Sequence, residues 1–213
     1  MKSVYQFWTE LVPLTTPMGL NNQQQREIQS LVIGGIQPLP QISEVNQASD
    51  SSTPPLPGAP TGFVWGKSSL AELQGVKEEL VDCATLALTR FSAVDFRCYD
   101  GLRTIEEQRR YLKNGRTRTM RSKHLEGLAV DLVPVIGGVL KWAWDGCFEI
   151  AWAMDQAATH MGIAGNIRWG GAWDRVLADY GNDRYAYKKE VQAYQNRHPG
   201  PYFIDGPHFE WVN

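Results

Sequence analysis

Two short segments about eighty residues apart constrain the fold of this chain more than any other feature. Ser122–Asp131 reads Ser-Lys-His-Leu-Glu-Gly-Leu-Ala-Val-Asp, and Asp205–His208 reads Asp-Gly-Pro-His; together they hold two of the four histidines. Imidazole nitrogens and carboxylate oxygens are zinc ligands, and a catalytic zinc site uses three protein ligands and keeps one position open. His124, Asp131 and His208 are the candidate ligands, so the fold must bring both segments to one point.

The first segment has to bend. The seven residue steps from His124 to Asp131 span roughly 23 Å in an extended strand and roughly 10 Å along a helix axis. Neither suits two ligands that must each lie about 2 Å from one ion. Gly127 is the residue that permits the required turn. Beyond it, strand alternation directs Val130 and Leu132 to the core and Asp131 to the opposite face.

The second segment is expected to be a loop that enters a strand, because Pro207 prevents a continuing helix. Asp205 then lies within reach of the zinc site without being a ligand, which suits a general base that takes a proton from water. Alternation places Glu210 on the same face as His208, where it is expected to orient the histidine. Glu210 is also the alternative candidate for the base. The pattern predicts a reaction centre rather than a structural zinc site, which a fourth ligand would close.

The ordered pattern Ser-x-His-x-x-Gly-x-Ala-x-Asp followed by Asp-x-x-His resembles the zinc D-Ala-D-Ala carboxypeptidase and L-alanyl-D-glutamate endopeptidase family, which includes bacteriophage endolysins. The resemblance covers roughly residues 68–213 and includes Gly-Leu-Arg-Thr at 101–104 and Ile-Arg-Trp-Gly-Gly-Ala-Trp at 167–173. It implies an α+β fold in which helices flank a small antiparallel sheet, as in Hedgehog and DD-peptidase domains. It also implies Zn²⁺ as the cofactor, held by His124, Asp131 and His208.

The resemblance implies roles for further side chains. Asp205 matches the catalytic carboxylate, and Arg103 matches the arginine thought to stabilise the oxyanion, as a fixed cation aimed at developing charge. Ser122 matches a substrate-contacting position, and Gln108 and Trp169 are further candidates for substrate contact. For the tryptophan the alternative is packing in the core. The alternative for the arginine is a salt bridge with Asp95, Asp100 or Glu106.

Three functions are compatible with these residues. We favour a zinc metallopeptidase that hydrolyses peptidoglycan stem peptides, specifically an L-alanyl-D-glutamate endopeptidase of a phage lysis system, because residues 167–173 and the Asp-Gly-Pro-His-Phe-Glu ending resemble phage lysins. A D-Ala-D-Ala carboxypeptidase is the close alternative. The third is a non-catalytic, metal-stabilised protein that binds the cell wall or belongs to the virion. The presence of Asp205 and Arg103 argues against this third function, because both residues suit catalysis.

The composition changes near residue 62. Residues 37–62 hold six of the twelve prolines and predict an extended Pro/Ser-rich linker. Residues 1–36 are interpreted as a tail, either flexible or docking to a larger assembly or the cell wall, because so short a segment rarely buries enough apolar area to fold alone. Residues 63–213 are expected to form the zinc peptidase catalytic domain.

Periodicity within this domain predicts helices and short strands without regular βαβ alternation, which is typical of α+β folds. One helix is expected from a capping box at Ser69 and Glu72 through Phe91. A second is expected after Thr104, and a third after an Asp145 cap. Further elements are predicted at 94–99, 129–133, 135–142, 167–171, 183–197 and 207–212.

The formal net charge of −2 gives no electrostatic reason to expect nucleic acid or an anionic membrane as a partner, so the expected partner is peptidoglycan peptide. The N-terminus lacks a convincing signal peptide, and no run of about 18 apolar residues occurs. We therefore expect synthesis in the host cytoplasm and action at the cell wall or periplasm. Association with the virion is left open.

Overall fold

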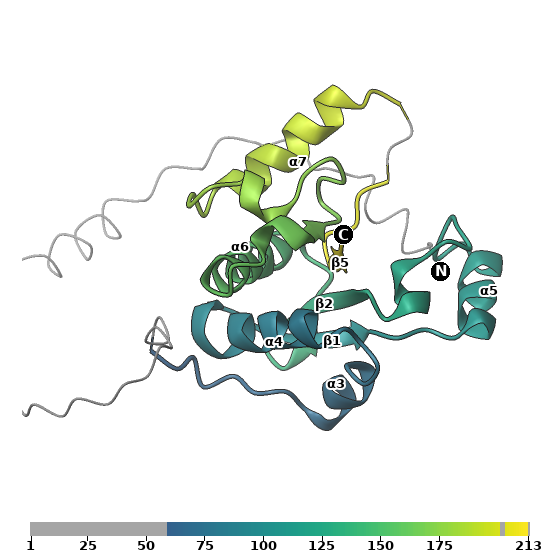
Figure 1. Ribbon diagram of the computed structural model, residues 1–213, viewed down its shortest axis with the longest axis horizontal. Helices are drawn as coiled ribbons and strands as arrows, with labels where there is room; N and C mark the ends of the chain where they lie inside the picture. The colour runs from purple at the N-terminus through teal and green to yellow at the C-terminus, as the bar shows by residue number, and fades with distance from the viewer. Residues whose placement is uncertain (1–58, 201–202, 213) are drawn as a thin grey trace, which may run out of the picture. The chain divides into compact units, whose positions relative to one another are not determined.

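The computed structural model describes residues 59–200 and 203–212, which form a five-stranded antiparallel sheet surrounded by helices (Figure 1). The predicted α+β class is confirmed. The expected tail and nearly all of the expected linker, up to residue 58, lie outside the described residues.

The sheet has the strand order β1-β2-β5-β4, and β3 pairs with the far end of β2. Gly137 and Gly138, both at positive φ, make the tight turn between β2 and β3. Val130 and Leu132 are fully buried, as the alternation predicted. The strands are β1 (Asp95–Asp100), β2 (Ala129–Ile136), β3 (Val139–Leu140), β4 (Ile167–Trp169) and β5 (His208–Trp211).

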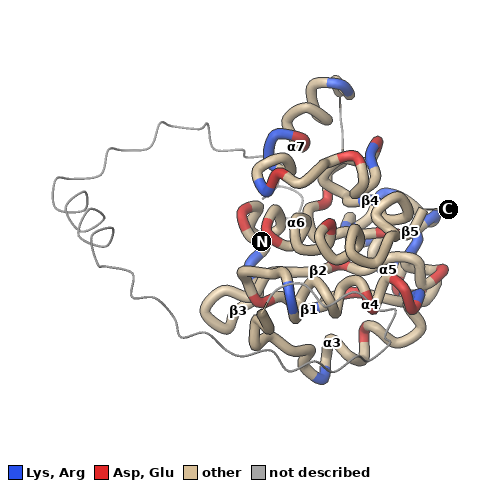
Figure 2. The backbone as a smooth tube through the Cα atoms, turned by 60° about the vertical axis from the view of Figure 1, so that its left-hand side comes forward, with Lys and Arg blue, Asp and Glu red and all other residues tan. Residues whose placement is uncertain are grey.

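The helices enclose an apolar core built on this sheet. The long helix α6 (Trp144–His160) packs on β2, while α4 (Glu78–Leu86) and the π-helical turn η1 (Ala87–Phe91) pack on α6. Helix α5 (Ile105–Lys113) lies at the right-hand edge of Figure 1, away from α6. Helix α7 (Ala186–Arg197) also contacts α6, and its charged positions are three basic residues and one acidic residue, Glu190 (Figure 2). The remaining elements are α3 (Lys67–Glu72), η2 (Lys123–Glu126), η3 (Ala164–Asn166) and η4 (Leu177–Asp179).

The long helix predicted from Ser69 to Phe91 is wrong in its first half. The chain forms α3, turns at residues 73–77, and starts again as α4. Gly75 has a φ of +78°, a left-handed conformation that ends a helix. The predicted capping box is absent, because Ser69 is buried within α3 and Gly66 occupies the cap position. The interruption matters for function, because the turn packs against the His124–Asp131 segment.

Of the other two predicted helix starts, the structure confirms the one at Thr104 and contradicts the one at Asp145. Thr104 caps α5, and its hydroxyl and backbone both bond Glu107 in the predicted reciprocal arrangement. Asp145 does not cap α6; it lies in the first turn, and Ala143 occupies the cap position. A carboxylate in the first turn still interacts favourably with the helix dipole. No helix in the described residues is long and apolar enough to cross a membrane.

Candidate metal centre

Three predicted ligands converge where β2 meets β5. Asp131 and His208 are direct partners in the antiparallel register of these strands. His124 lies on η2, and Gly127 turns the chain back into β2 with a φ of +66°. A Cβ at Gly127 would stand 2.2 Å from the carbonyl oxygen of Gly75, so the close approach as well as the φ requires glycine. The predicted turn is therefore confirmed.

The donor atoms have the spacing of a metal site. His124 Nε2 lies 3.2 Å from His208 Nδ1 and 3.3 Å from Asp131 Oδ1. His208 Nδ1 lies 3.0 Å from the same Asp131 oxygen. Donors bound tetrahedrally at about 2.0–2.1 Å from zinc lie roughly 3.3 Å apart, which agrees with these three separations.

Hydrogen bonding on the far side of each imidazole determines which nitrogen faces the centre. His124 Nδ1 lies 2.7 Å from the carbonyl oxygen of Gly101, which can only accept, so Nδ1 donates and Nε2 keeps a lone pair. His208 Nε2 lies 3.1 Å from Glu210 Oε2, and in the neutral tautomer that donates this bond His208 Nδ1 keeps a lone pair. Two lone pairs and a carboxylate oxygen thus meet in a buried place, an arrangement that repels itself unless a cation lies between them.

The pKa shifts of Asp131 and His208 also indicate that this point favours positive charge. Burial acts to raise the pKa of Asp131, but His124 and His208 outweigh it and hold this pKa well below its usual range. Burial acts to lower the pKa of His208, but hydrogen bonds with Asp131 and Glu210 outweigh it and raise this pKa to about 10. His124, Asp131 and His208 therefore form a possible metal site.

Asp205 lies beside this group on the loop before β5. Burial, reinforced by the charge of Asp131, raises the pKa of Asp205 to about 6. Its backbone is fixed from both sides, because its N–H donates to Gly170 O and its carbonyl accepts from the N–H of His208. A Cβ at Gly170 would come within 2.4 Å of the Asp205 carbonyl oxygen, so glycine lets the two segments meet.

Arg103 is buried on the other side of Asp131, 4.0 Å from its Oδ2. One terminal nitrogen donates to Asp100 Oδ2 at 2.9 Å, and the other donates to Gln108 Oε1 at 2.6 Å. The guanidinium carbon lies 4.5 Å from the centroid of the Tyr111 ring. The salt bridge to Asp100 was one of the alternatives for this arginine, and it holds the positive charge beside the centre.

Glu210 contacts His208 as the alternation predicted, and it is itself held by Arg168. The guanidinium of Arg168 donates through Nε and a second nitrogen to Glu210 Oε1, and it reaches the Trp173 carbonyl through its third. These contacts, with His208, outweigh burial and lower the pKa of Glu210 to about 2. Sequence reasoning missed Arg168, because the signal is the pairing of β4 with β5 rather than a motif.

The candidate substrate contacts differ in accessibility. Ser122 is half-buried at the start of η2 and its side chain makes no cap bond. Gln108 and Trp169 are fully buried, so in this fold neither presents surface to a peptide. Gln108 holds Arg103 and donates to the Thr119 carbonyl, and Trp169 donates to the Gly206 carbonyl from the core.

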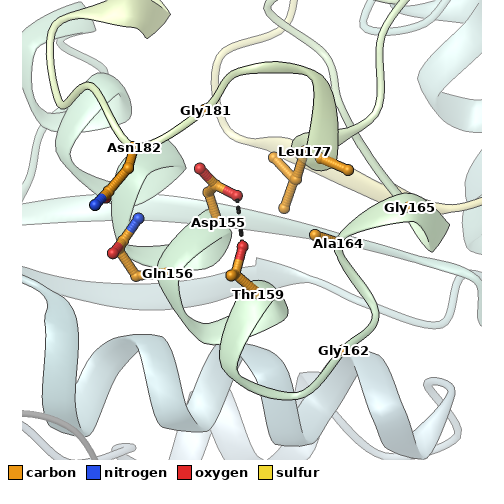
Figure 3. Close-up of a pocket in the computed structure, with 10 residues that line it drawn as sticks. Asp155, Gln156, Thr159, Gly162, Ala164, Gly165, Leu177, Gly181 and Asn182 are labelled. Carbon is orange, nitrogen blue, oxygen red and sulfur yellow. Dashed lines mark hydrogen bonds between the residues drawn. The ribbon is translucent and has the colours of Figure 1, made fainter.

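A separate cleft of about 580 Å³ lies at the C-terminal end of α6, lined also by residues near η3 and η4 (Figure 3). It includes none of the three candidate ligands. Its buried carboxylate, Asp155, accepts from the hydroxyls of Thr159 and Tyr187. Those bonds make Asp155 part of the packing of α7 on α6.

Known proteins share this fold and these motifs. A model of the phage L-alanyl-D-glutamate peptidase family matches residues 61–212. The L-alanyl-D-glutamate peptidase of Escherichia phage T5 is 33% identical over 122 residues, which cover 55% of this chain and 86% of the relative. The crystal structure of the Serratia marcescens L-Ala D-Glu endopeptidase ChiX matches with a TM-score of 0.50 and 33% identity, over 68% of this chain and 87% of that one. The chain therefore belongs to the phage L-alanyl-D-glutamate peptidase family and is a peptidase that acts on peptidoglycan.

Proposed function

We propose that the enzyme is zinc-dependent, that His124, Asp131 and His208 hold the ion, and that Asp205 is the general base. The observation that carries the proposal is the convergence of three potential ligand atoms at mutual distances of 3.0–3.3 Å. Two histidines and one carboxylate are a usual ligand set for catalytic zinc, whose fourth position is left for water or substrate. When bound, zinc polarises a carbonyl oxygen and lowers the pKa of water.

Asp205 would transfer a proton from the attacking water to the leaving amine. Its carboxylate accepts the proton that the attacking water loses and returns it to the amine of D-glutamate as the bond to L-alanine breaks. A pKa raised to about 6 suits both steps, because the group is mostly ionised at neutral pH yet still holds a proton long enough to deliver it. Glu210, bonded to the far nitrogen of His208, is better suited to orienting that ring than to accepting the water's proton.

Arg103 would stabilise the negative charge that develops on the scissile carbonyl oxygen. Its guanidinium is fixed by Asp100 and Gln108, so little reorganisation accompanies the reaction. The position 4.0 Å from Asp131 puts this charge at the edge of the centre. In this scheme Gln108 is a positioning residue behind Arg103, and Ser122, at the surface beside His124, is the remaining candidate for direct contact with the peptide.

Cleavage of purified peptidoglycan by wild type and Asp205→Asn, with the new termini identified by mass spectrometry, tests the proposal. We expect wild type to expose N-terminal D-glutamate and Asp205→Asn to be at least about a hundredfold slower. Asp183→Asn, an exposed carboxylate before α7, is the matched control and should cleave as wild type does. Released D-alanine would instead identify a carboxypeptidase. An Asp205→Asn variant as fast as wild type would show that Asp205 is not the base.

We also propose that residues 1–36 dock the catalytic domain to a larger assembly or the cell wall through a linker at 37–62. The start of the family match at residue 61 supports a boundary there. Removing residues 1–62 should leave hydrolysis of soluble substrate intact and abolish localisation. Loss of hydrolysis of a soluble peptide by the shortened chain would contradict this division.

A further inference from the structure

The positive charge of this chain is concentrated in one segment beside the metal centre. Residues 109–123, here called the basic segment, contain seven of the 21 Lys and Arg residues and none of the 23 Asp and Glu residues. The rest of the chain therefore carries 14 basic residues against 23 acidic ones. The modest net charge of −2 hides this separation. The cations are Arg109, Arg110, Lys113, Arg116, Arg118, Arg121 and Lys123.

Most of these cations are exposed and have no acidic partner. All but Lys123 are exposed. Among these seven cations, only two lie within 4.0 Å of a carboxylate of the described residues. Arg110 lies near Glu107, and Lys123 lies near Glu126. Arg116 instead donates to the hydroxyl of Tyr99. The five cations without a carboxylate partner repel one another, so their clustering is better explained by an external anion than by the stability of the fold.

The basic segment runs directly into the reaction centre. It ends one residue before His124, and Gln108, which holds Arg103, also donates to the Thr119 carbonyl within it. The guanidinium of Arg118 lies 5.7 Å from the centroid of the Phe203 ring. That ring stacks on Trp173, whose own ring lies 5.2 Å from the ring of His208. Arg118 therefore reaches the segment that carries Asp205.

The substrate has the charge that such a segment would bind. In an L-alanyl-D-glutamyl peptide the scissile bond uses the amine of glutamate, and the chain continues through one of its two carboxyl groups. The other carboxylate is free on the residue whose bond is cut, and a further carboxylate ends the peptide. Guanidinium groups bind carboxylates through paired, charge-assisted hydrogen bonds.

We propose that the basic segment binds the free carboxylates of the stem peptide beside the scissile bond. This deepens the proposed function and rests on it. Arg118 and Arg121 are the best candidates, because they are the two arginines nearest to His124 on the loop that joins α5 to η2, whereas Lys123 is paired with Glu126. The segment would distinguish peptides with free carboxylates from peptides in which these groups are amides, and its contribution would weaken as salt is added.

Two matched peptides test this inference with the full-length, zinc-loaded enzyme. One is an L-alanyl-D-glutamyl peptide with its free carboxylates, and the other is the same peptide with those groups as primary amides. For the carboxylate peptide we expect R118Q/R121Q to raise KM about fivefold, in the range of two exposed ion pairs, with kcat within about twofold. For the amide peptide the same variant should resemble wild type within about twofold.

Two further variants separate charge from structure. R118K/R121K keeps both charges, so its KM for the carboxylate peptide should return most of the way to the wild-type value. K141Q/K188Q removes two exposed lysines from β3–α6 and α7, and it should match wild type on both peptides. The inference would be overturned if wild type had the same KM for both peptides and R118Q/R121Q left these values unchanged. The proposed function would remain intact in that case. Cleavage of neither peptide by wild type would instead overturn the proposed function.

A phosphate-bearing wall polymer is the main competing anion. Sedimentation with walls that carry such a polymer, and with walls stripped of it, distinguishes the two. If R118Q/R121Q loses binding only to the phosphate-bearing walls and its KM for both peptides is unchanged, the segment binds phosphate and the inference is wrong. If the KM for the carboxylate peptide rises and binding to both walls falls alike, the inference holds.

Discussion

His208 and Glu210 are joined by a hydrogen bond of 3.1 Å between Nε2 and Oε2, on the side of the imidazole that faces away from Asp131. When Nε2 donates this bond and the ring is neutral, Nδ1 of His208 has its lone pair available for an ion. Because Arg168 holds the other oxygen of Glu210, the orientation of a candidate ligand depends on a residue that does not touch the centre.

We expect Arg168→Gln to weaken zinc binding about tenfold, at the lower end of the effect of residues that orient metal ligands. Glu210→Gln should weaken it more, because it alters the direct partner of His208. Competition with a chromogenic chelator measures the dissociation constant. Arg197→Gln, which removes an exposed arginine paired with Asp174 on the surface, is the control. An unchanged zinc affinity in Arg168→Gln would show that His208 is oriented without this support.

The pH dependence of hydrolysis should follow the ionisation of Asp205. Since its pKa is raised to about 6, the carboxylate is protonated below this pH and cannot accept a proton from water. We therefore expect kcat/KM to rise about tenfold per pH unit in the acidic range and to level off at or below about pH 6, since a bound cation lowers the pKa of a neighbouring carboxylate. Initial rates on a soluble peptide between pH 4.5 and 8, at saturating zinc, provide the profile. A flat profile over the whole range from pH 4.5 to 8 would count against Asp205 as the base.

Gly127→Ala tests the turn that brings His124 to Asp131. Alanine at this position combines an unfavourable φ with a clash against the backbone of Gly75. Gly115 has a similar φ of +68° but open space around it, so Gly115→Ala has the conformational penalty alone. We expect Gly127→Ala to lower the free energy of unfolding by about 1–3 kcal/mol more than Gly115→Ala does, as measured by chemical denaturation. Equal losses would mean that the close approach to Gly75 is unimportant.

Tyr187→Phe tests the buried contact between α6 and α7. The Tyr187 hydroxyl donates to Asp155 at 2.6 Å, and burial raises the pKa of Asp155. A carboxylate whose folded pKa is raised destabilises the fold once it ionises, so stability falls as pH rises from the unfolded pKa through the folded one. Without the hydroxyl we expect a loss of about 1–3 kcal/mol at pH 7 and a smaller loss at pH 4. Tyr185→Phe, at an exposed tyrosine, should change little at either pH. A loss at pH 4 as large as at pH 7 would contradict the role of the ionised carboxylate.

The parts of the site that depend on short-range order could be predicted from the sequence. Gly127 and the face of Asp131 follow from local geometry, and Glu210 follows from strand alternation next to His208. Arg168 could not be predicted in this way, because its contact with Glu210 depends on the register of β4 and β5 across 42 residues. Periodicity also could not decide whether Trp169 lies in the core or at the surface.

The error at residues 69–91 has a similar origin. The helical spacing of the apolar residues continues across the break at Gly75, so the pattern alone predicts one helix. The turn forms because its backbone meets the η2–β2 segment, where the Lys77 N–H donates to the Gly127 carbonyl. That contact joins residues far apart in the chain, and tertiary packing overrides the local helical preference.

Removal and restoration of the metal test the central claim most directly. The full-length enzyme is dialysed against a chelator, its zinc content is measured, and cleavage of peptidoglycan is followed by mass spectrometry of the new termini before and after zinc is returned. The account predicts about one zinc per chain, loss of cleavage on its removal, and renewed exposure of N-terminal D-glutamate when zinc is restored. Cleavage at an undiminished rate by protein without zinc would contradict it.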